Sequence, residues 1–216
     1  MKAYEKVFIS SLVVLAAVLY TELNRKENIF PENIKHKSVS RHPLPAIMTS
    51  SGVDSVAIKQ LLPLFKIKKD EYDPNSIIYY REKSIPDLCH GNAAYCYFEQ
   101  VNNVAGNLRF CFQVQTNEWM FIKKCQFLVD GIPYEYYPEN LEYYPGDKAK
   151  VCEWFDDSVN ENNIRIIKAV STAADVKVKI TGRHNHTIIS IPQNQIKSIF
   201  NTLSLFIALN GNDHSS

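Results

Sequence analysis

Cysteine beside histidine is one of the few pairings in this chain that could do covalent chemistry. Cys89 and His90 are adjacent, and a nucleophilic thiol needs an imidazole base within hydrogen-bond reach. Sequence neighbours rarely face each other in that way, so we expect a loop pair without a catalytic role. The chain also has no Gly-x-Ser-x-Gly, phosphate-loop or dinucleotide-binding sequence. The sequence therefore indicates no catalytic residue and no cofactor.

Two histidines separated by one residue could bind a transition metal. His184 and His186 would supply two imidazole ligands, but no third ligand is visible near them. The cysteines show no Cys-x-x-Cys spacing of the kind found in zinc sites. We therefore predict exposed turn histidines and no metal site. Asn185-His186-Thr187 is also a glycosylation sequence, which has meaning only in a eukaryotic secretory protein.

Three carboxylates gather near the end of a predicted strand, where a pair could act as general acid and base. They are Glu153, Asp156 and Asp157. Capping of a following helix by Asp156, Asp157 and Ser158 explains the two aspartates without chemistry. A hydrolase of envelope polymers that uses Glu153 or Asp156 remains an alternative interpretation.

Five tyrosines fall between residues 134 and 144. Tyrosine gives large contact area at a low cost in conformational entropy and is enriched in binding surfaces. Coverage of the sheet edge and the rim of the core is the simpler interpretation. The residues of the candidate binding surface are Tyr134, Tyr136, Tyr137, Tyr143 and Tyr144.

The stretch from residue 107 to 131 is the predicted centre of the fold. From Leu108 to Gln115, apolar and polar residues alternate with the period of a half-buried strand. A second apolar run follows the polar residues 116–118 and ends at the turn dipeptide Asp130-Gly131. We expect these runs to form a hairpin, with Trp119 and Trp154 as buried anchors.

The remaining pattern predicts an α+β domain over residues 53–209, an antiparallel sheet with helices packed mainly on one face, preceded by an N-terminal apolar helix. A turn centred on residues 104 and 105 would place Phe98 opposite Cys111, with Cys96 as the diagonal neighbour. Residues 139–150 are predicted to form a loop. The expected strands are 77–81, 93–101, 132–138, 150–155, 176–181 and 187–191, and the expected helices are 54–62, 161–173 and 192–209.

The N-terminus has the layout of an export signal. Lys2 and Lys6 precede an apolar run over residues 7–20, which is short for a membrane span of roughly 17 to 25 residues. An uncleaved signal anchor over residues 1–23 is the favoured interpretation, and a secretory peptide or a buried soluble helix are the others. A polar linker over residues 24–52 and a short tail over 210–216 complete the expected organisation.

Composition excludes some classes of protein. The chain has 216 residues, 45% of them hydrophobic, and a net charge of +1. It lacks the basic cluster that nucleic-acid binders carry, so no nucleic-acid partner is expected. Its five cysteines are either small buried hydrophobic residues or include one or two disulfides formed in an oxidising compartment.

Several anchors of the predicted strands and helices resemble a family of small exported bacterial domains of uncharacterised function, which often follow a lipoprotein or export signal. The matching segments are Trp119-x-Phe121-Ile122-Lys123, Phe127-x-Val129-Asp130-Gly131, Glu153-Trp154 and residues 164–182. The resemblance implies an envelope location and a fold but carries over no catalytic residues. This chain departs from the family in its five cysteines, its tyrosine-rich segment and its lack of a lipidated cysteine.

These observations together predict a binding or interaction module at the bacterial envelope. The N-terminal segment would hold it at the membrane, and its partner would be a protein or an envelope polymer. The alternatives are the hydrolase described above and a structural accessory subunit of a larger envelope complex.

Overall fold

Two antiparallel sheets form the framework of the chain. The structure is a computed structural model that describes residues 53–69, 77–145 and 150–210. The predicted α+β class with antiparallel strands is confirmed, but the strands form a six-stranded and a four-stranded sheet and not a single one. The predicted N-terminal helix and linker within residues 1–52, and residues 211–216 of the predicted tail, lie outside the described residues.

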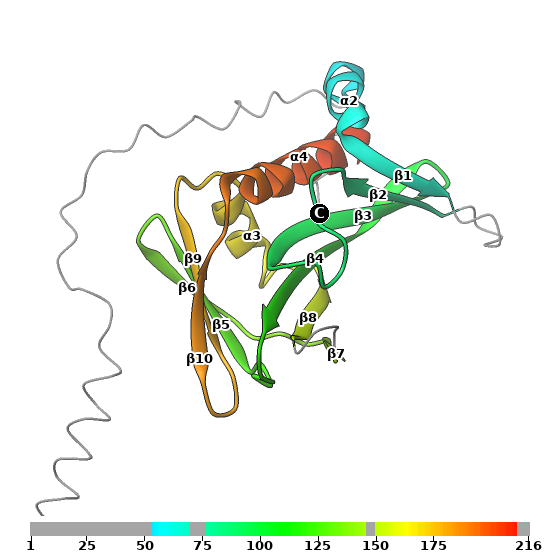
Figure 1. Cartoon of the computed structure of the whole chain (residues 1–216). Helices are drawn as coiled ribbons and strands as arrows, with labels where there is room; N and C mark the ends of the chain where they lie inside the picture. Colours follow the sequence, from blue (N-terminus) through cyan, green and yellow to red (C-terminus); the bar gives the residue numbers. More distant parts are fainter. Residues whose placement is uncertain (1–52, 70–76, 146–149, 211–216) are drawn as a thin grey trace, which may run out of the picture. The chain divides into compact units, whose positions relative to one another are not determined.

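The larger sheet has the strand order β1-β2-β3-β4-β8-β7 (Figure 1). Its strands are β1 (Phe65–Lys69), β2 (Ile78–Glu82), β3 (Ala93–Val101), β4 (Val104–Thr116), β7 (Leu141–Tyr144) and β8 (Val151–Ser158). The sequence pattern does not predict β1 or β7, and β7 lies in the expected loop over residues 139–150. Both are edge strands with little burial, so neither shows a clear alternation of apolar and polar residues.

A two-residue turn joins β3 to β4. Asn102 and Asn103 have φ angles of 51° and 67°, and asparagine tolerates this left-handed conformation better than most residues. The prediction that the turn lies further along the chain is wrong. As a result, Cys111 lies opposite Tyr95 and not opposite Phe98.

The smaller sheet has the strand order β10-β9-β5-β6. Its strands are β5 (Lys124–Val129), β6 (Ile132–Tyr136), β9 (Val176–Thr181) and β10 (His186–Ser190). Asp130 and Gly131, with φ of 48° and 85°, form the predicted turn between β5 and β6.

The predicted central hairpin is wrong, because β4 and β5 belong to different sheets. Residues 119–123 are not a strand, although their apolar character is typical of one. This crossover segment leaves the larger sheet at the end of β4 and enters the smaller sheet at β5. It therefore links the two sheets covalently.

Three α-helices complete the described part of the chain: α2 (Ser55–Leu61), α3 (Ile164–Ser171) and α4 (Gln193–Asn210). Helix α4 packs chiefly on β3 and contacts both α2 and α3 (Figure 1). Asp54 caps α2, with its side chain accepting from the N–H groups of Val56 and Ala57. None of the described helices combines the length and apolar character that crossing a membrane requires.

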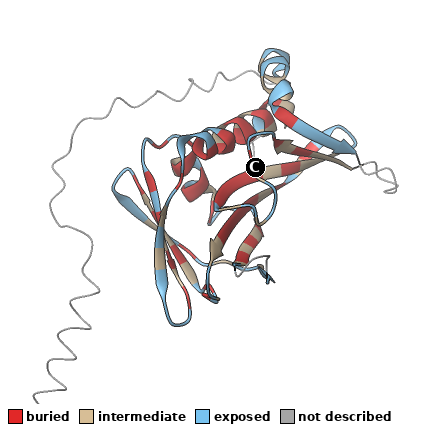
Figure 2. Cartoon of the chain, in the orientation of Figure 1, coloured by how far each residue is buried: buried red, intermediate tan, exposed pale blue. Residues whose placement is uncertain are grey.

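The core lies between the two sheets and beneath the helices, where the buried residues of Figure 2 converge. Its centre is aromatic, because Phe127 of the smaller sheet packs against Phe110 and Phe112 of the larger one, at ring-centroid distances of 6.1 and 6.0 Å. Phe155 stacks on Phe112 at 5.6 Å. These rings therefore join the sheets through side-chain packing.

Phe155 and Trp154 are adjacent on β8 but face opposite sides of the larger sheet. Phe155 is fully buried, whereas Trp154 is half-buried and packs on a small cluster with Ile85 and Tyr95. Trp119 is also half-buried, so the prediction that both tryptophans are buried anchors is wrong.

Replacing Phe155 with Ala should lower the free energy of unfolding by about 3 to 5 kcal/mol, because it leaves a cavity in the aromatic centre. The loss from Trp154→Ala should be smaller, because that ring is already partly in water. Urea denaturation followed by far-UV circular dichroism measures both. Equal losses in the two variants would contradict this assignment of the core.

Candidate functional site

A buried carboxyl group holds the crossover between the sheets. Glu153 of β8 is fully buried, and its two oxygens accept hydrogen bonds from the main-chain N–H groups of Met120, Phe121 and Ile122. The last two bonds measure 3.1 and 3.0 Å between nitrogen and oxygen. Consecutive N–H groups that converge in this way form a concave anion-binding site. Here the chain's own carboxyl group fills that site.

Phe121 is the strained residue of the crossover. Its φ is 52°, in the left-handed region that costs a bulky L-residue roughly 1–2 kcal/mol. The hydrogen bonds to Glu153 offset this cost. Met120 and Ile122 are buried on either side, while Phe121 remains 45% exposed. The fold therefore holds a large apolar side chain at the surface by means of a buried polar group.

Three aromatic rings meet at this point, and we refer to Trp119, Phe121 and Tyr143 as the aromatic cluster. The ring-centroid distances are 6.3 Å between Trp119 and Phe121, 5.9 Å between Trp119 and Tyr143, and 6.3 Å between Phe121 and Tyr143. Tyr143 lies on β7 directly opposite Glu153 and is 46% exposed. The residue that anchors the crossover is therefore also the cross-strand neighbour of the third ring.

The smaller sheet fixes the same crossover from its other side. The main-chain N–H of Arg183 donates to the carbonyl oxygen of Met120 at 2.7 Å, and that of Lys123 donates to the carbonyl oxygen of Thr181 at 2.9 Å. Gly182 makes this approach possible, because a Cβ atom there would lie 2.1 Å from the Met120 oxygen. The aromatic cluster thus rests on both sheets.

The structure divides the five tyrosines of the predicted surface. Tyr143 and Tyr144 are exposed on β7, and Tyr137 is exposed after β6. Tyr134 is half-buried on β6. Tyr136 is in the core and stacks on Phe155, so its inclusion in an exposed surface is corrected. Only three of the five residues are therefore exposed.

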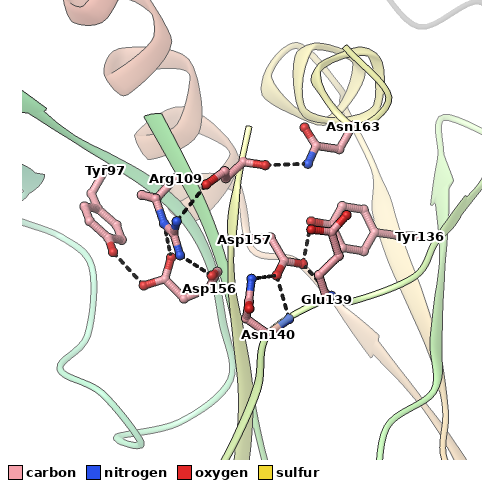
Figure 3. A network of polar contacts seen from close by, with 9 residues as sticks. Tyr97, Arg109, Tyr136, Glu139, Asn140, Asp156, Asp157 and Asn163 are labelled. Atoms are coloured by element: carbon pink, nitrogen blue, oxygen red, sulfur yellow. Dashed lines mark hydrogen bonds and ion pairs between the residues drawn. The ribbon is translucent and has the colours of Figure 1, made fainter. Parts of the chain in front are cut away.

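Asp157 of β8 organises the segment that follows β6 (Figure 3). Its carboxyl group accepts hydrogen bonds from the hydroxyl of Tyr136 at 3.0 Å and from the main-chain N–H groups of Glu139 and Asn140 at 3.2 and 2.9 Å. Burial, with a smaller contribution from Asp157, raises the pKa of Tyr136 above its ordinary 10.0. The phenol therefore stays a hydrogen-bond donor at neutral pH.

Asp156 points to the opposite face of the larger sheet (Figure 3), as strand alternation requires. The guanidinium of Arg109 donates to its carboxyl group at 2.9 Å, and the hydroxyl of Tyr97 donates to it as well. Burial raises the pKa of Tyr97, and Asp156 adds to the effect. The side chains of Tyr97, Arg109 and Asp156 therefore link β3, β4 and β8 on the face of the larger sheet away from the main core.

The three carboxylates do not form an acid–base pair. Glu153 and Asp157 share a face but are four residues apart on one strand, which corresponds to about 13 Å. A glycoside-hydrolase pair needs about 5 to 9.5 Å. Donors of the chain itself occupy all three side chains. The predicted capping role of Asp156 and Asp157 is also wrong, because both lie within β8 and Asn163 precedes α3.

Cys89 and Cys152 form a disulfide, with a Cα–Cα distance of 5.6 Å. It joins the loop before β3 to strand β8, so Cys89 has no free thiol for the nucleophilic role considered with His90. The remaining cysteines, Cys96, Cys111 and Cys125, are buried and free. Desolvation raises the pKa of Cys111 and of Cys125 to about 12, which keeps both as neutral thiols.

His184 and His186 are exposed residues at the end of the β9–β10 hairpin. Within residues 53–69, 77–145 and 150–210, no group of three or more His, Cys, Asp or Glu side chains has an arrangement that could hold a metal ion.

Sequence reasoning found Tyr143 but missed Trp119 and Phe121 as its partners. The only available signal was the unbroken apolar run from Trp119 to Ile122, where a half-buried strand would alternate.

Comparison with family models, curated proteins and solved structures gives no match to this chain.

Replacing Glu153 with Gln should destabilise the protein by about 1–3 kcal/mol, because one carboxyl oxygen becomes an NH2 group that faces N–H donors and leaves them unpaired. Trp119 fluorescence should change as the crossover loosens. Chemical denaturation and emission spectra measure the two effects. Glu118→Gln, at an exposed neighbouring residue, is the matched control, and equal stability of both variants would contradict the anchoring role.

Full-length protein unfolded without reductant should show three reactive thiols per chain, because Cys89 and Cys152 are paired. The folded protein should show almost none at pH 8, since alkylating reagents attack the thiolate and burial suppresses it. Mass spectrometry after iodoacetamide treatment counts the modified residues. Five modified cysteines in the unfolded sample would contradict the disulfide.

Proposed function

We propose that this protein is a membrane-tethered or exported component of the bacterial envelope that binds a partner through its aromatic cluster. The observation that carries the binding role is the construction around Glu153. A buried carboxyl group and a left-handed phenylalanine hold an apolar ring in water. Local backbone strain of this kind concentrates at functional sites. The fold itself gains no apolar burial from holding the Phe121 ring at the surface.

The composition of the aromatic cluster supports a binding role. Tryptophan and tyrosine dominate the residues that contribute most to protein–protein affinity. They also combine a large apolar surface with a polar group, which suits a partner that is partly hydrated.

The proposed location rests on three features. The N-terminal residues have the layout of an export signal, and the Cys89–Cys152 disulfide is of the kind that persists in oxidising compartments. The resemblance to small exported bacterial domains agrees with both. The partner is then a protein or an envelope polymer outside the cytoplasm.

The test compares two double variants of the tagged full-length protein, purified from detergent-solubilised membranes. Phe121→Ser with Tyr143→Ser removes two rings of the aromatic cluster. Ile132→Ser with Tyr137→Ser removes two exposed apolar residues elsewhere, with exposed fractions of 55% and 62%. The first variant should recover its partner at least about tenfold less than wild type, corresponding to roughly 1.4 kcal/mol of binding free energy. The second should match wild type.

Both variants should keep the wild-type circular dichroism spectrum, because all four residues are exposed. Unchanged partner recovery by the first variant would refute the role of the aromatic cluster. Equal loss in both variants would instead favour the alternative of a structural accessory subunit that contacts its complex over a broad surface.

A further inference from the structure

Among the described residues, strand β10 forms one unpaired edge of the smaller sheet. The main-chain N–H of Ile191 donates to the carbonyl oxygen of Val176 at 2.9 Å, which fixes the ladder between β9 and β10. Hydrogen-bonded pairs alternate along an antiparallel ladder, so every second residue of β10 directs its main-chain groups away from β9. In the register of this hairpin, these residues are His186, Ile188 and Ser190.

Two of the three other sheet edges, β1 and β6, carry features that disfavour pairing with another chain. Strand β1 presents Lys66, Lys68 and Lys69, and lysines are a common protection of an edge. Strand β6 contains Pro133, which has no N–H to donate. Strand β10, His-Thr-Ile-Ile-Ser, has neither lysine nor proline, and its central Ile188 is 50% exposed. The β10 edge is therefore open to strand addition.

The sequence of β10 is also complementary to itself. Ile188 is the middle residue of the strand, so an antiparallel twofold axis at Ile188 places it opposite Ile188 of the partner subunit. The same axis places His186 opposite Ser190 of the partner subunit. These are the residues whose main-chain groups point outward, so each facing pair can exchange two hydrogen bonds.

We infer that β10 is the contact surface of a homodimer, in which two copies pair antiparallel about Ile188 and join their four-stranded sheets into one. The exposed isoleucines cover each other in the centre of the contact, as in other cross-strand pairs.

Charge does not oppose this arrangement. Lys179 lies opposite Ile188 within the hairpin, but the two copies of Lys179 are three strand spacings apart, about 14 Å. This separation exceeds the Debye length of about 8 Å at physiological ionic strength. The repulsion between the two ammonium groups is therefore largely screened.

A contact limited to one five-residue strand is small beside the 1,200 to 2,000 Å² or so that specific interfaces bury. We therefore expect a weak dimer in dilute solution and a larger dimeric fraction where the chains are concentrated, as on a membrane surface. The dimer does not depend on the function proposed for the aromatic cluster, which lies outside β10.

Disulfide cross-linking of the full-length protein at high concentration tests the register. Hydrogen-bonded antiparallel neighbours have Cα atoms about 5.5 Å apart, within the range for a disulfide. Ile188→Cys should therefore give a covalent dimer on a non-reducing gel after mild oxidation. Ser190→Cys and Lys179→Cys should not, because neither residue meets its own copy.

A second pair of variants tests the contact without cysteine chemistry. Ile188→Lys places a lysine on the β10 edge, like the lysines on β1. It should raise the dimer dissociation constant at least about tenfold in sedimentation measurements. Ile207→Lys removes an isoleucine that is 40% exposed on α4 and should leave it unchanged. A monomer at every concentration, or stronger cross-linking of Ser190→Cys than of Ile188→Cys, would overturn the proposed dimer.

Discussion

The carboxyl group of Glu153 is the interaction on which the arrangement of the two sheets depends. A buried carboxyl group without partners is costly, and a crossover between two sheets leaves main-chain N–H groups without a ladder. One contact gives hydrogen-bond partners to both the carboxyl group and the crossover, since the N–H groups from Met120 to Ile122 donate to the buried Glu153 side chain. The path of the chain into β5 and the exposure of Phe121 both follow from this contact.

Strand β8 distributes its acidic side chains among three different parts of the fold. Glu153 holds the crossover, Asp157 holds the segment after β6, and Asp156 holds Arg109 and Tyr97 on the other face of the sheet. Fully satisfied polar networks of this kind favour one arrangement of the chain over others. Apolar packing between the sheets supplies most of the stability, and these carboxyl groups select the geometry.

Much of the secondary structure was predictable, because strands with one buried face alternate visibly. The expected ranges of β3 and β9 match the structure, and α4 ends within a residue of its expected limit. The crossover was not predictable, because Trp119 to Ile122 has the composition of a strand and its anchor lies more than thirty residues away. For the same reason, the sequence marks Tyr143 by composition but gives no sign of its contact with Phe121.

The Cys89–Cys152 disulfide, with a sequence separation of 63 residues, encloses β3 to β7 in a covalent ring. A protease that cuts any peptide bond between these two cysteines leaves both fragments attached to each other. The two fragments then remain parts of one molecule, and their core contacts stay in place. A single nick in this region would therefore convert one chain into two without releasing either piece.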